Sequence, residues 1–125
     1  MSERRPHEAD TAPVNLTEAG HALLAMARGT DNGHASQLLI GGSRQRAVLM
    51  ALTGGAGLNE HESPPAATFQ VVSGTARLYA VDGPSWVVAA GQLVTIPATR
   101  HGVEALEDCV ILLTVSLGQT ADGAV

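Results

Sequence analysis

The sequence predicts an all-β fold, an antiparallel barrel or sandwich of short strands preceded by one short α-helix. From about residue 35 onward, short apolar runs alternate with turn pairs such as Gly41-Gly42 and Asp82-Gly83, with no helical segment between them. That spacing is typical of an antiparallel sandwich or barrel. Helical periodicity is confined to one stretch before these runs. The core must be aliphatic, because the only aromatic residues are Phe69, Tyr79 and Trp86.

The helix is expected over about residues 16–28. Asn15 is a favourable N-cap residue, and Glu18 three positions later completes the pattern of a capping box. Gly29 is a natural stop. The apolar positions that share one helical face are Leu16, Ala19, Leu23 and Met26.

The strand pattern gives a single domain over residues 14–117, with the barrel over about 35–116. The polar segments 1–13 and 118–125 lack periodicity, and we expect them to be flexible tails. The last apolar run has no polar face, which suits a strand between two layers. The expected strands are Ser36–Ile40, Arg46–Leu52, Thr68–Ser73, Ala76–Val81, Trp86–Ala89, Leu93–Ile96, His101–Leu106 and Cys109–Val115.

Composition excludes several classes of function. The net charge is −5 and the seven basic residues, all Arg, are scattered, so nucleic acid is not an expected partner. Cys109 is the only cysteine, which rules out an internal disulfide, and we expect it to be a buried structural thiol. No apolar run has the length of a secretory signal or a membrane span, so we expect a cytoplasmic protein that does not contact membranes.

Two segments, residues 55–74 and 91–101, carry glycine and histidine at regular spacings. They resemble the two motifs of the cupin superfamily, G-x5-H-x-H-x3-E-x6-G and G-x5-P-x-G-x2-H-x3-N. The resemblance covers residues 47–115 and is strongest to small stand-alone bacterial cupins. It implies a jelly-roll, or double-stranded β-helix, and a homodimer formed through sheet edges and the helix. The matching residues are Gly55, His61, Gly74, Gly91, Pro97 and His101.

The metal site that the resemblance implies is incomplete. Cupins hold their metal with two His and one Glu of the first motif and one His of the second. Here His61 and His101 remain, although His101 comes one residue early, while Ser63 and Ala67 stand at the other two positions. No cofactor is therefore expected, unless His61 and His101 weakly hold zinc, iron, manganese or nickel. Glu62 is a candidate third ligand if a bulge turns it inward.

Two functions remain open. The first is a small-molecule-binding module (a sensor, carrier or sequestering protein) whose apolar cavity takes a small organic molecule. The alternative is an enzyme in which His61 and His101 act as acid and base. It would be a metal-independent isomerase or cyclase, or a metal-dependent isomerase or dioxygenase with a reduced ligand set. Strand alternation puts Asn59 and Ser63 on the face of His61. The expected ligand contacts are Asn59, Ser63, Ala67, Phe69 and Val103.

Some residues have a plainer interpretation. His61 and His101 could be relics of a lost site, satisfied by water and by each other. Arg100 could bind an anionic group, but strand alternation favours a solvated position at the rim. Phe69 and Trp86 could line a pocket, yet single aromatic residues on strands are usually part of the core. A regulatory interaction module is a third functional class, without direct DNA contact.

Overall fold

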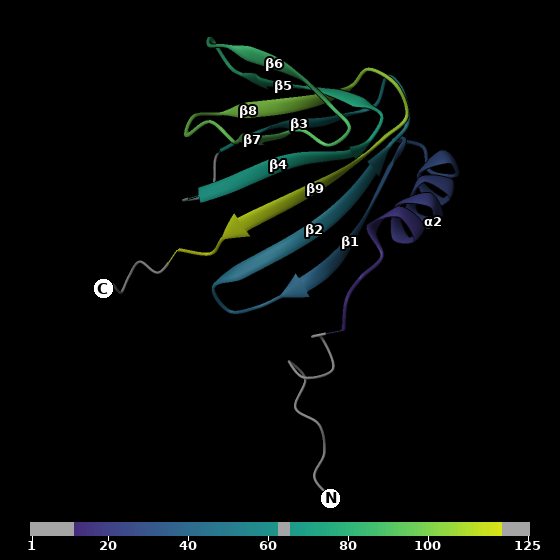
Figure 1. Cartoon of the computed structure of the whole chain (residues 1–125). Coiled ribbons are helices and arrows are strands. Elements are labelled where there is room, and N and C mark those ends of the chain that lie inside the picture. Colours follow the sequence, from purple (N-terminus) through teal and green to yellow (C-terminus); the bar gives the residue numbers. More distant parts are fainter. Residues whose placement is uncertain (1–11, 63–65, 119–125) are drawn as a thin grey trace, which may run out of the picture.

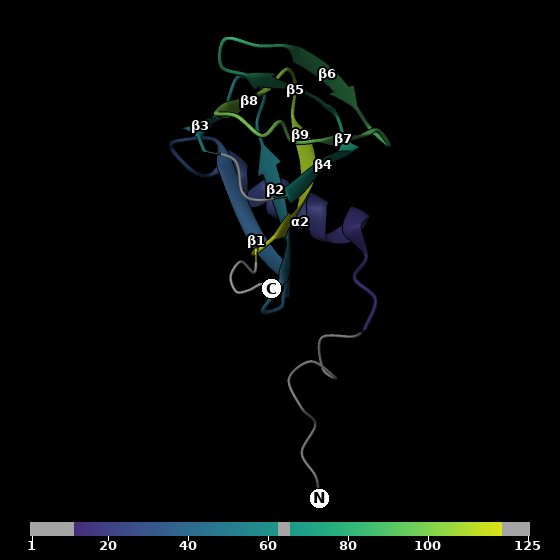
Figure 2. The ribbon, with the colours of Figure 1, turned by 90° about the vertical axis from the view of Figure 1, so that its left-hand side faces the viewer.

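The computed structural model describes residues 12–62 and 66–118, which form one helix and two antiparallel sheets. The five-stranded sheet has the order β1-β2-β9-β4-β7 and the four-stranded sheet the order β3-β8-β5-β6. The two sheets face each other, and the helix covers the outer side of the larger one (Figures 1 and 2). The elements are α2 (Leu16–Arg28), β1 (His34–Gly41), β2 (Gln45–Leu52), β3 (Gly57–His61), β4 (Ala66–Ser73), β5 (Thr75–Ala80), β6 (Ser85–Ala89), β7 (Leu93–Thr95), β8 (His101–Ala105) and β9 (Cys109–Ser116).

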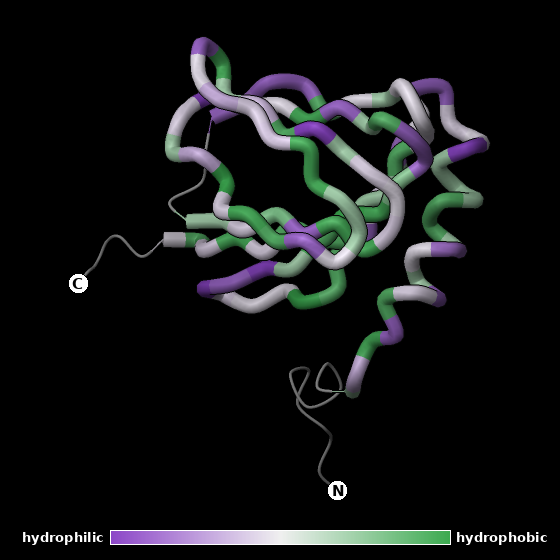
Figure 3. Tube along the Cα trace, turned by 45° about the horizontal axis from the view of Figure 1, so that its top comes forward, coloured by the Kyte–Doolittle hydropathy of each residue, from purple (hydrophilic) through white to green (hydrophobic). Residues whose placement is uncertain are grey.

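The predicted helix is confirmed, although Met26, one of the four residues expected on its apolar face, is 62% exposed. The side chain of Asn15 accepts a hydrogen bond from the backbone N–H of Glu18 at 3.0 Å, which satisfies one of the unpaired donors of the first turn. The backbone N–H of Gly29 closes the other end by donating to Met26 at 3.0 Å. Figure 3 shows apolar and polar positions alternating along the helix. An amphipathic helix of this kind gains its stability from the surface that it covers.

The eight predicted strands are all present, and one further strand, β3, was not predicted. None of the expected strands covers residues 53–67, but Gly57 already belongs to the ladder, opposite Glu104. A Cβ atom at Gly57 would lie 2.8 Å from the carbonyl oxygen of Val103, so only glycine permits this close pairing. A short strand that begins with glycine and has few buried side chains gives almost no periodic signal.

The space between the two sheets is filled by aliphatic side chains around Phe69, which is fully buried. Trp86 does not belong to this core, contrary to the expectation for single aromatic residues, because it lies on the edge strand β6 with 37% of its surface exposed. The buried members of this inner core are Leu52, Ala67, Phe69, Val71, Ala76, Leu78, Val88, Ile96, Val103, Ala105, Cys109 and Ile111.

A second apolar layer lies between the helix and the outer face of the five-stranded sheet. Gly20 allows the helix to approach β9 closely, since a Cβ atom there would already be 3.1 Å from a methyl group of Val110. β9 thus carries apolar side chains on both faces, as expected for a strand between two layers. The buried members of this layer are Leu23, Ala27, Leu49, Ala51 and Val110.

Most of the two expected tails, namely residues 1–11 and 119–125, lies outside the described residues. Within the described part of the chain, no helix is long and apolar enough to cross a membrane.

In the turn between β5 and β6, Asp82 adopts a left-handed backbone with φ of 58°. The tight turn predicted at Asp82-Gly83 therefore needs positive φ at its first residue.

Candidate functional site

The structure brings His61 and His101 together on neighbouring strands of the four-stranded sheet. His61 ends β3 and His101 begins β8, and the two residues are direct partners in the antiparallel ladder. The centroids of the two imidazole rings are 4.5 Å apart, with the ring planes tilted by 60°. Two residues separated by forty positions in the chain thus form one polar cluster.

Both imidazoles are oriented by the same backbone contact. The Nδ1 atom of His61 lies 3.0 Å from the carbonyl oxygen of Asn59, and that of His101 lies 2.9 Å from the carbonyl oxygen of Thr99. A carbonyl oxygen only accepts hydrogen bonds, so each Nδ1 carries the proton. In the neutral rings, Nε2 is then an acceptor. Among the residues that the structure describes, hydrogen bonds of the two rings are found only at Nδ1.

The two histidines differ sharply in burial. His101 is 2% exposed and is the one buried polar residue among those described, whereas His61 is exposed. The pair therefore extends from the barrel wall to the solvent. A molecule from solution can reach His61 directly, while the ring of His101 lies behind it in a less polar environment.

An irregularity in β3 sets the direction of His61. The register advances three residues on β3, from Leu58 to His61, but only two on β8, from Val103 to His101, which is a β-bulge. Leu58 packs against the inner core, and the bulge returns His61 to the side of its partner His101. Simple alternation, which placed Asn59 beside His61, does not hold across this bulge.

The other residues expected to contact a ligand lie in different places. Ala67, Phe69 and Val103 belong to the inner core and are 7%, 0% and 4% exposed. Of these three residues, Val103 is the nearest to the pair along the chain, two positions after His101 on the same strand. The side chain of Asn59 is exposed. Ser63 lies outside the described residues.

Glu62 does not complete a metal site in the arrangement that the structure shows. Its carboxylate lies 3.3 Å from the guanidinium of Arg100, with 82% of the side chain exposed. Within the described residues, no group of three or more His, Cys, Asp or Glu side chains could hold a metal ion. Two imidazoles alone do not match the three or more protein ligands of a typical transition-metal site, so the described donors do not fit a firmly held metal.

Arg100 connects β8 to the bulged end of β3. Its guanidinium donates a hydrogen bond of 3.1 Å to the carbonyl oxygen of Glu60 and lies 4.0 Å from the carboxylate of the same residue. The carboxylate of Glu60 also accepts a hydrogen bond of 3.2 Å from the hydroxyl of Tyr79. Arg100 was expected at the solvated rim, and half of its side-chain surface is exposed. Its contacts with β3 were not predicted.

These charged groups line a pocket of about 550 Å³ on the outer side of the four-stranded sheet. Burial raises the pKa of Tyr79, and the negative charge of Glu60 and the hydrogen bond to it act in the same direction. The phenol therefore stays a hydrogen-bond donor at neutral pH. Across the sheet, Arg77 pairs with Glu104 at 2.7 Å and lies 4.7 Å above the ring of Tyr79.

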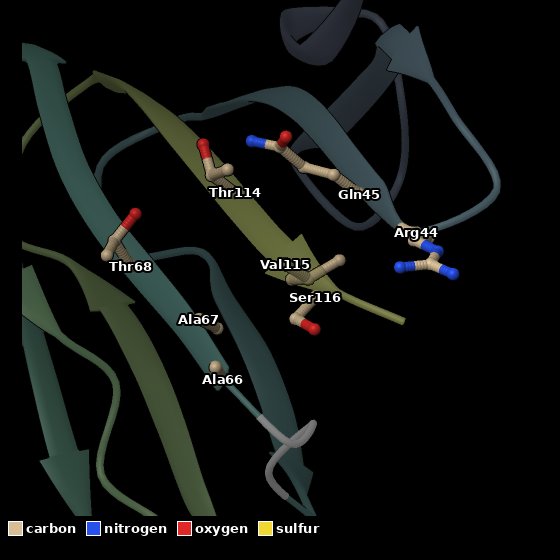
Figure 4. Close-up of a pocket in the computed structure, with 8 residues that line it drawn as sticks. All are labelled: Arg44, Gln45, Ala66, Ala67, Thr68, Thr114, Val115 and Ser116. Atoms are coloured by element: carbon tan, nitrogen blue, oxygen red, sulfur yellow. The ribbon is translucent and has the colours of Figure 1, made fainter. Parts of the chain in front are cut away.

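A second pocket, of about 380 Å³, lies where β2 and β4 begin and β9 ends. Figure 4 shows Gln45, Thr68 and Thr114 extending to the same side of the sheet. Ala67 is the one predicted contact residue that lines it, and neither histidine does. The lining residues are Arg44, Gln45, Ala66, Ala67, Thr68, Thr114, Val115 and Ser116.

Comparison with known proteins identifies the fold family. The family model described as the cupin domain matches residues 48–115, more than half of the chain. The chain belongs to the cupin family. The resemblance noted in the two motifs is thereby confirmed, as is the jelly-roll arrangement of two antiparallel sheets with one N-terminal helix.

Solved structures similar to this cupin come from several bacteria. A conserved protein of unknown function from Streptococcus pyogenes has a TM-score of 0.67 and 23% identity, covering 88% of this chain and 90% of its own. A cupin superfamily protein from Desulfitobacterium hafniense has a TM-score of 0.65 and 17% identity, covering 71% and 82%. A cupin-2 domain protein from Shewanella frigidimarina has a TM-score of 0.64 and 17% identity, covering 87% and 97%. No curated protein matches this cupin.

Sequence reasoning missed the contacts made by Glu60, Tyr79 and Arg100. Glu60 and Arg100 are 40 residues apart, and they meet only because β3 pairs with β8. Strand alternation was assumed around His61, but the pairing of this segment with β8 was not predicted, so nothing in the local sequence indicated that these side chains would share a surface.

Proposed function

We propose that this cupin binds a small organic molecule at the end of the barrel where β3 ends and β8 begins, with His61 and His101 as its polar anchor. The observation that supports the proposal is the pair of imidazoles 4.5 Å apart, each held through Nδ1 by a backbone carbonyl. Two pre-oriented Nε2 atoms beside an apolar core are the combination that small-molecule sites use: a few convergent polar groups against an apolar surface.

The chemistry of the anchor limits the ligand. A neutral imidazole accepts a hydrogen bond at Nε2, and a protonated imidazole donates one. The pair therefore suits an uncharged molecule with a hydroxyl group or a weakly anionic molecule such as a small carboxylic acid. Because the interior beside Phe69 is filled, the ligand would contact the exposed His61 first rather than enter deep between the sheets.

A titration followed by NMR tests this proposal. Benzoate and pyruvate serve as anionic probes and benzyl alcohol as a neutral one, with the imidazole nitrogen resonances as the readout. We expect at least one probe to shift the resonances of both His61 and His101. In His61→Ala the ligand-induced shift of His101 should disappear, and in His101→Gln that of His61 should disappear. Binding that persists in the double variant would contradict the proposal.

A second candidate function is acid-base catalysis by the same pair. The short distance of 4.5 Å between the ring centroids favours it, because both imidazoles can then reach the same ligand. An isomerase or cyclase needs one such group to remove a proton and another to return it. Exchange of deuterium from heavy water into the methyl group of pyruvate, measured by NMR, separates this function from simple binding. Loss of exchange in each single histidine variant would support catalysis.

We further propose that the protein forms a homodimer through its sheet edges. The edge strand β1 carries Leu38 and Ile40 with 54% and 40% of their surfaces exposed, and the helix exposes Met26. Exposed edges of this kind are normally covered. Light scattering should give the mass of two chains, and Leu38→Glu should reduce it toward the mass of one. A monomer in the wild-type protein would refute the proposal.

A further inference from the structure

We infer that Arg100 is the positioning residue for His61: its side chain fastens the bulged end of β3 to β8 and thereby holds the His61 imidazole against His101. The inference rests on the proposed function for its biological meaning, since it deepens the same site. Arg100 touches neither imidazole. It acts through the backbone of β3, from the opposite side of the sheet.

The contacts of Arg100 converge on the two residues that flank His61. One nitrogen of the guanidinium donates to the carbonyl oxygen of Glu60 at 3.1 Å, and another lies 3.3 Å from the carboxylate of Glu62. A planar guanidinium with several donors can span two such acceptors at once, which a lysine ammonium cannot do with the same geometry. Arg100 therefore contacts the backbone before His61, at Glu60, and the side chain after it, at Glu62.

The contacts of Arg100 with Glu60 and Glu62 are important because the end of β3 makes few other contacts with β8. The strand pairs with β8 at Gly57, Leu58 and His61, but the bulge interrupts the ladder between the last two. His61 is exposed, so burial does not fix its ring as it fixes that of His101. The bond from His61 Nδ1 runs to the carbonyl oxygen of Asn59, which is a residue of the bulge itself. The direction of the imidazole thus follows the geometry of the bulge.

Tyr79 supplies a second support for the same backbone. Its hydroxyl donates to the carboxylate of Glu60, and its ring lies over Gly102 of β8. A Cβ atom at Gly102 would be 2.6 Å from the Cζ atom of Tyr79, so glycine is required for the ring to lie this close to β8. Glu60 is consequently oriented from two sides, by Tyr79 and by Arg100.

The side chain of Arg100 can be changed without moving the start of β8. The backbone of Arg100 is anchored separately, because its carbonyl oxygen accepts a hydrogen bond of 2.8 Å from the N–H of Val81. His101 keeps its own bond to Thr99 and its burial. His101 is therefore an internal reference: a change confined to His61 reports positioning, and a change in both rings reports general loss of structure.

The experiment compares Arg100→Ala and Arg100→Lys with the wild-type protein by nitrogen-15 NMR of the two imidazoles. The readouts are the tautomer of His61 and the cross-relaxation between the two rings, neither of which needs a ligand. In Arg100→Ala we expect the ratio of the Nδ1–H to the Nε2–H tautomer of His61 to fall by about three- to tenfold, the effect of losing one modest hydrogen-bond constraint. Arg100→Lys should restore only part of the wild-type tautomer ratio of His61. The tautomer of His101 should stay unchanged in both variants.

The matched control is Arg28→Ala, which also removes a surface arginine from an ion pair, with Asp108 at 2.8 Å, but at the helix. It should leave both imidazoles as in the wild-type protein. If Arg100→Ala does not fold, Glu62→Ala removes only the carboxylate that contacts Arg100 and should shift the His61 tautomer in the same direction by less. An unchanged His61 in Arg100→Ala, or equal changes in Arg28→Ala, would overturn the inference. Because no ligand is used, failure of the proposed function leaves this result interpretable.

Discussion

His61 and His101 are direct partners in the β3–β8 ladder, yet one imidazole is exposed and the other is 2% exposed. His61 ends the edge strand β3, whereas His101 lies on the inner strand β8, and this difference in position accounts for the asymmetry. A ligand at the pair would thus meet a solvent-exposed imidazole backed by a buried one. The asymmetry also has consequences for stability.

Replacing the two histidines should affect the free energy of unfolding unequally. His101→Ala removes a buried ring and leaves the carbonyl oxygen of Thr99 without its partner, and we expect a loss of about 1–3 kcal/mol. His61→Ala removes an exposed side chain and should cost less than about 0.5 kcal/mol. Urea denaturation of both variants measures the difference. Equal losses would show that the two rings are buried alike in solution.

Gly74, the closing glycine of the first motif, should not tolerate alanine. It joins β4 to β5 with φ of +80°, and a Cβ atom would overlap the carbonyl oxygen of Asp108 and the backbone of Cys109. We expect Gly74→Ala to lower the free energy of unfolding by more than about 3 kcal/mol, since strain and overlap add. Gly91→Ala is the control: its φ is +87°, but nothing lies within 4 Å of the added atom. It should cost only the backbone strain, about 1 kcal/mol.

Asp108 should make the protein less stable in acid. A hydrogen bond from the backbone N–H of Gly54 lowers the pKa of Asp108 below its ordinary 3.8, and the guanidinium of Arg28 acts in the same direction. Because the pKa of Asp108 is lower in the folded state, its ionised carboxylate stabilises the folded protein. This contribution to the free energy of unfolding is fully present above the unfolded pKa and is lost as the pH falls through the folded pKa. The melting temperature of the wild-type protein should therefore drop more steeply below pH 4 than that of Asp108→Asn. Parallel curves for the two proteins would contradict this.

Cys109 should resist thiol reagents while the protein is folded. Its side chain is fully buried, and burial, together with the charges of Asp108 and Glu107, raises the pKa of the thiol to about 11. The reactive thiolate is therefore scarce at pH 8, and a disulfide reagent such as Ellman's cannot reach it. We expect no release of the coloured thiol product from the native protein and full release in concentrated urea. Rapid reaction of the native protein would contradict the buried position.

Much of the fold could be predicted from local patterns. The capping residue Asn15 and the apolar stripe after it defined the helix, because capping and helical periodicity act over only a few residues. The apolar runs defined the strands, and β9 was correctly placed between two layers because it has no polar face. The positions of His61 and His101 within the two motifs were also visible, as was the lack of the other ligands.

By itself, the sequence determined the helix, most strands, the family and the identity of the two imidazoles. Only the tertiary structure decided how β3 bulges, which histidine is buried, and that Arg100 contacts Glu60 and Glu62. These features depend on the register between strands about forty residues apart, and a single inserted residue in one strand changes which side chains share a face. Local propensity carries no information about that register, because it is fixed by pairing and packing across the whole sheet.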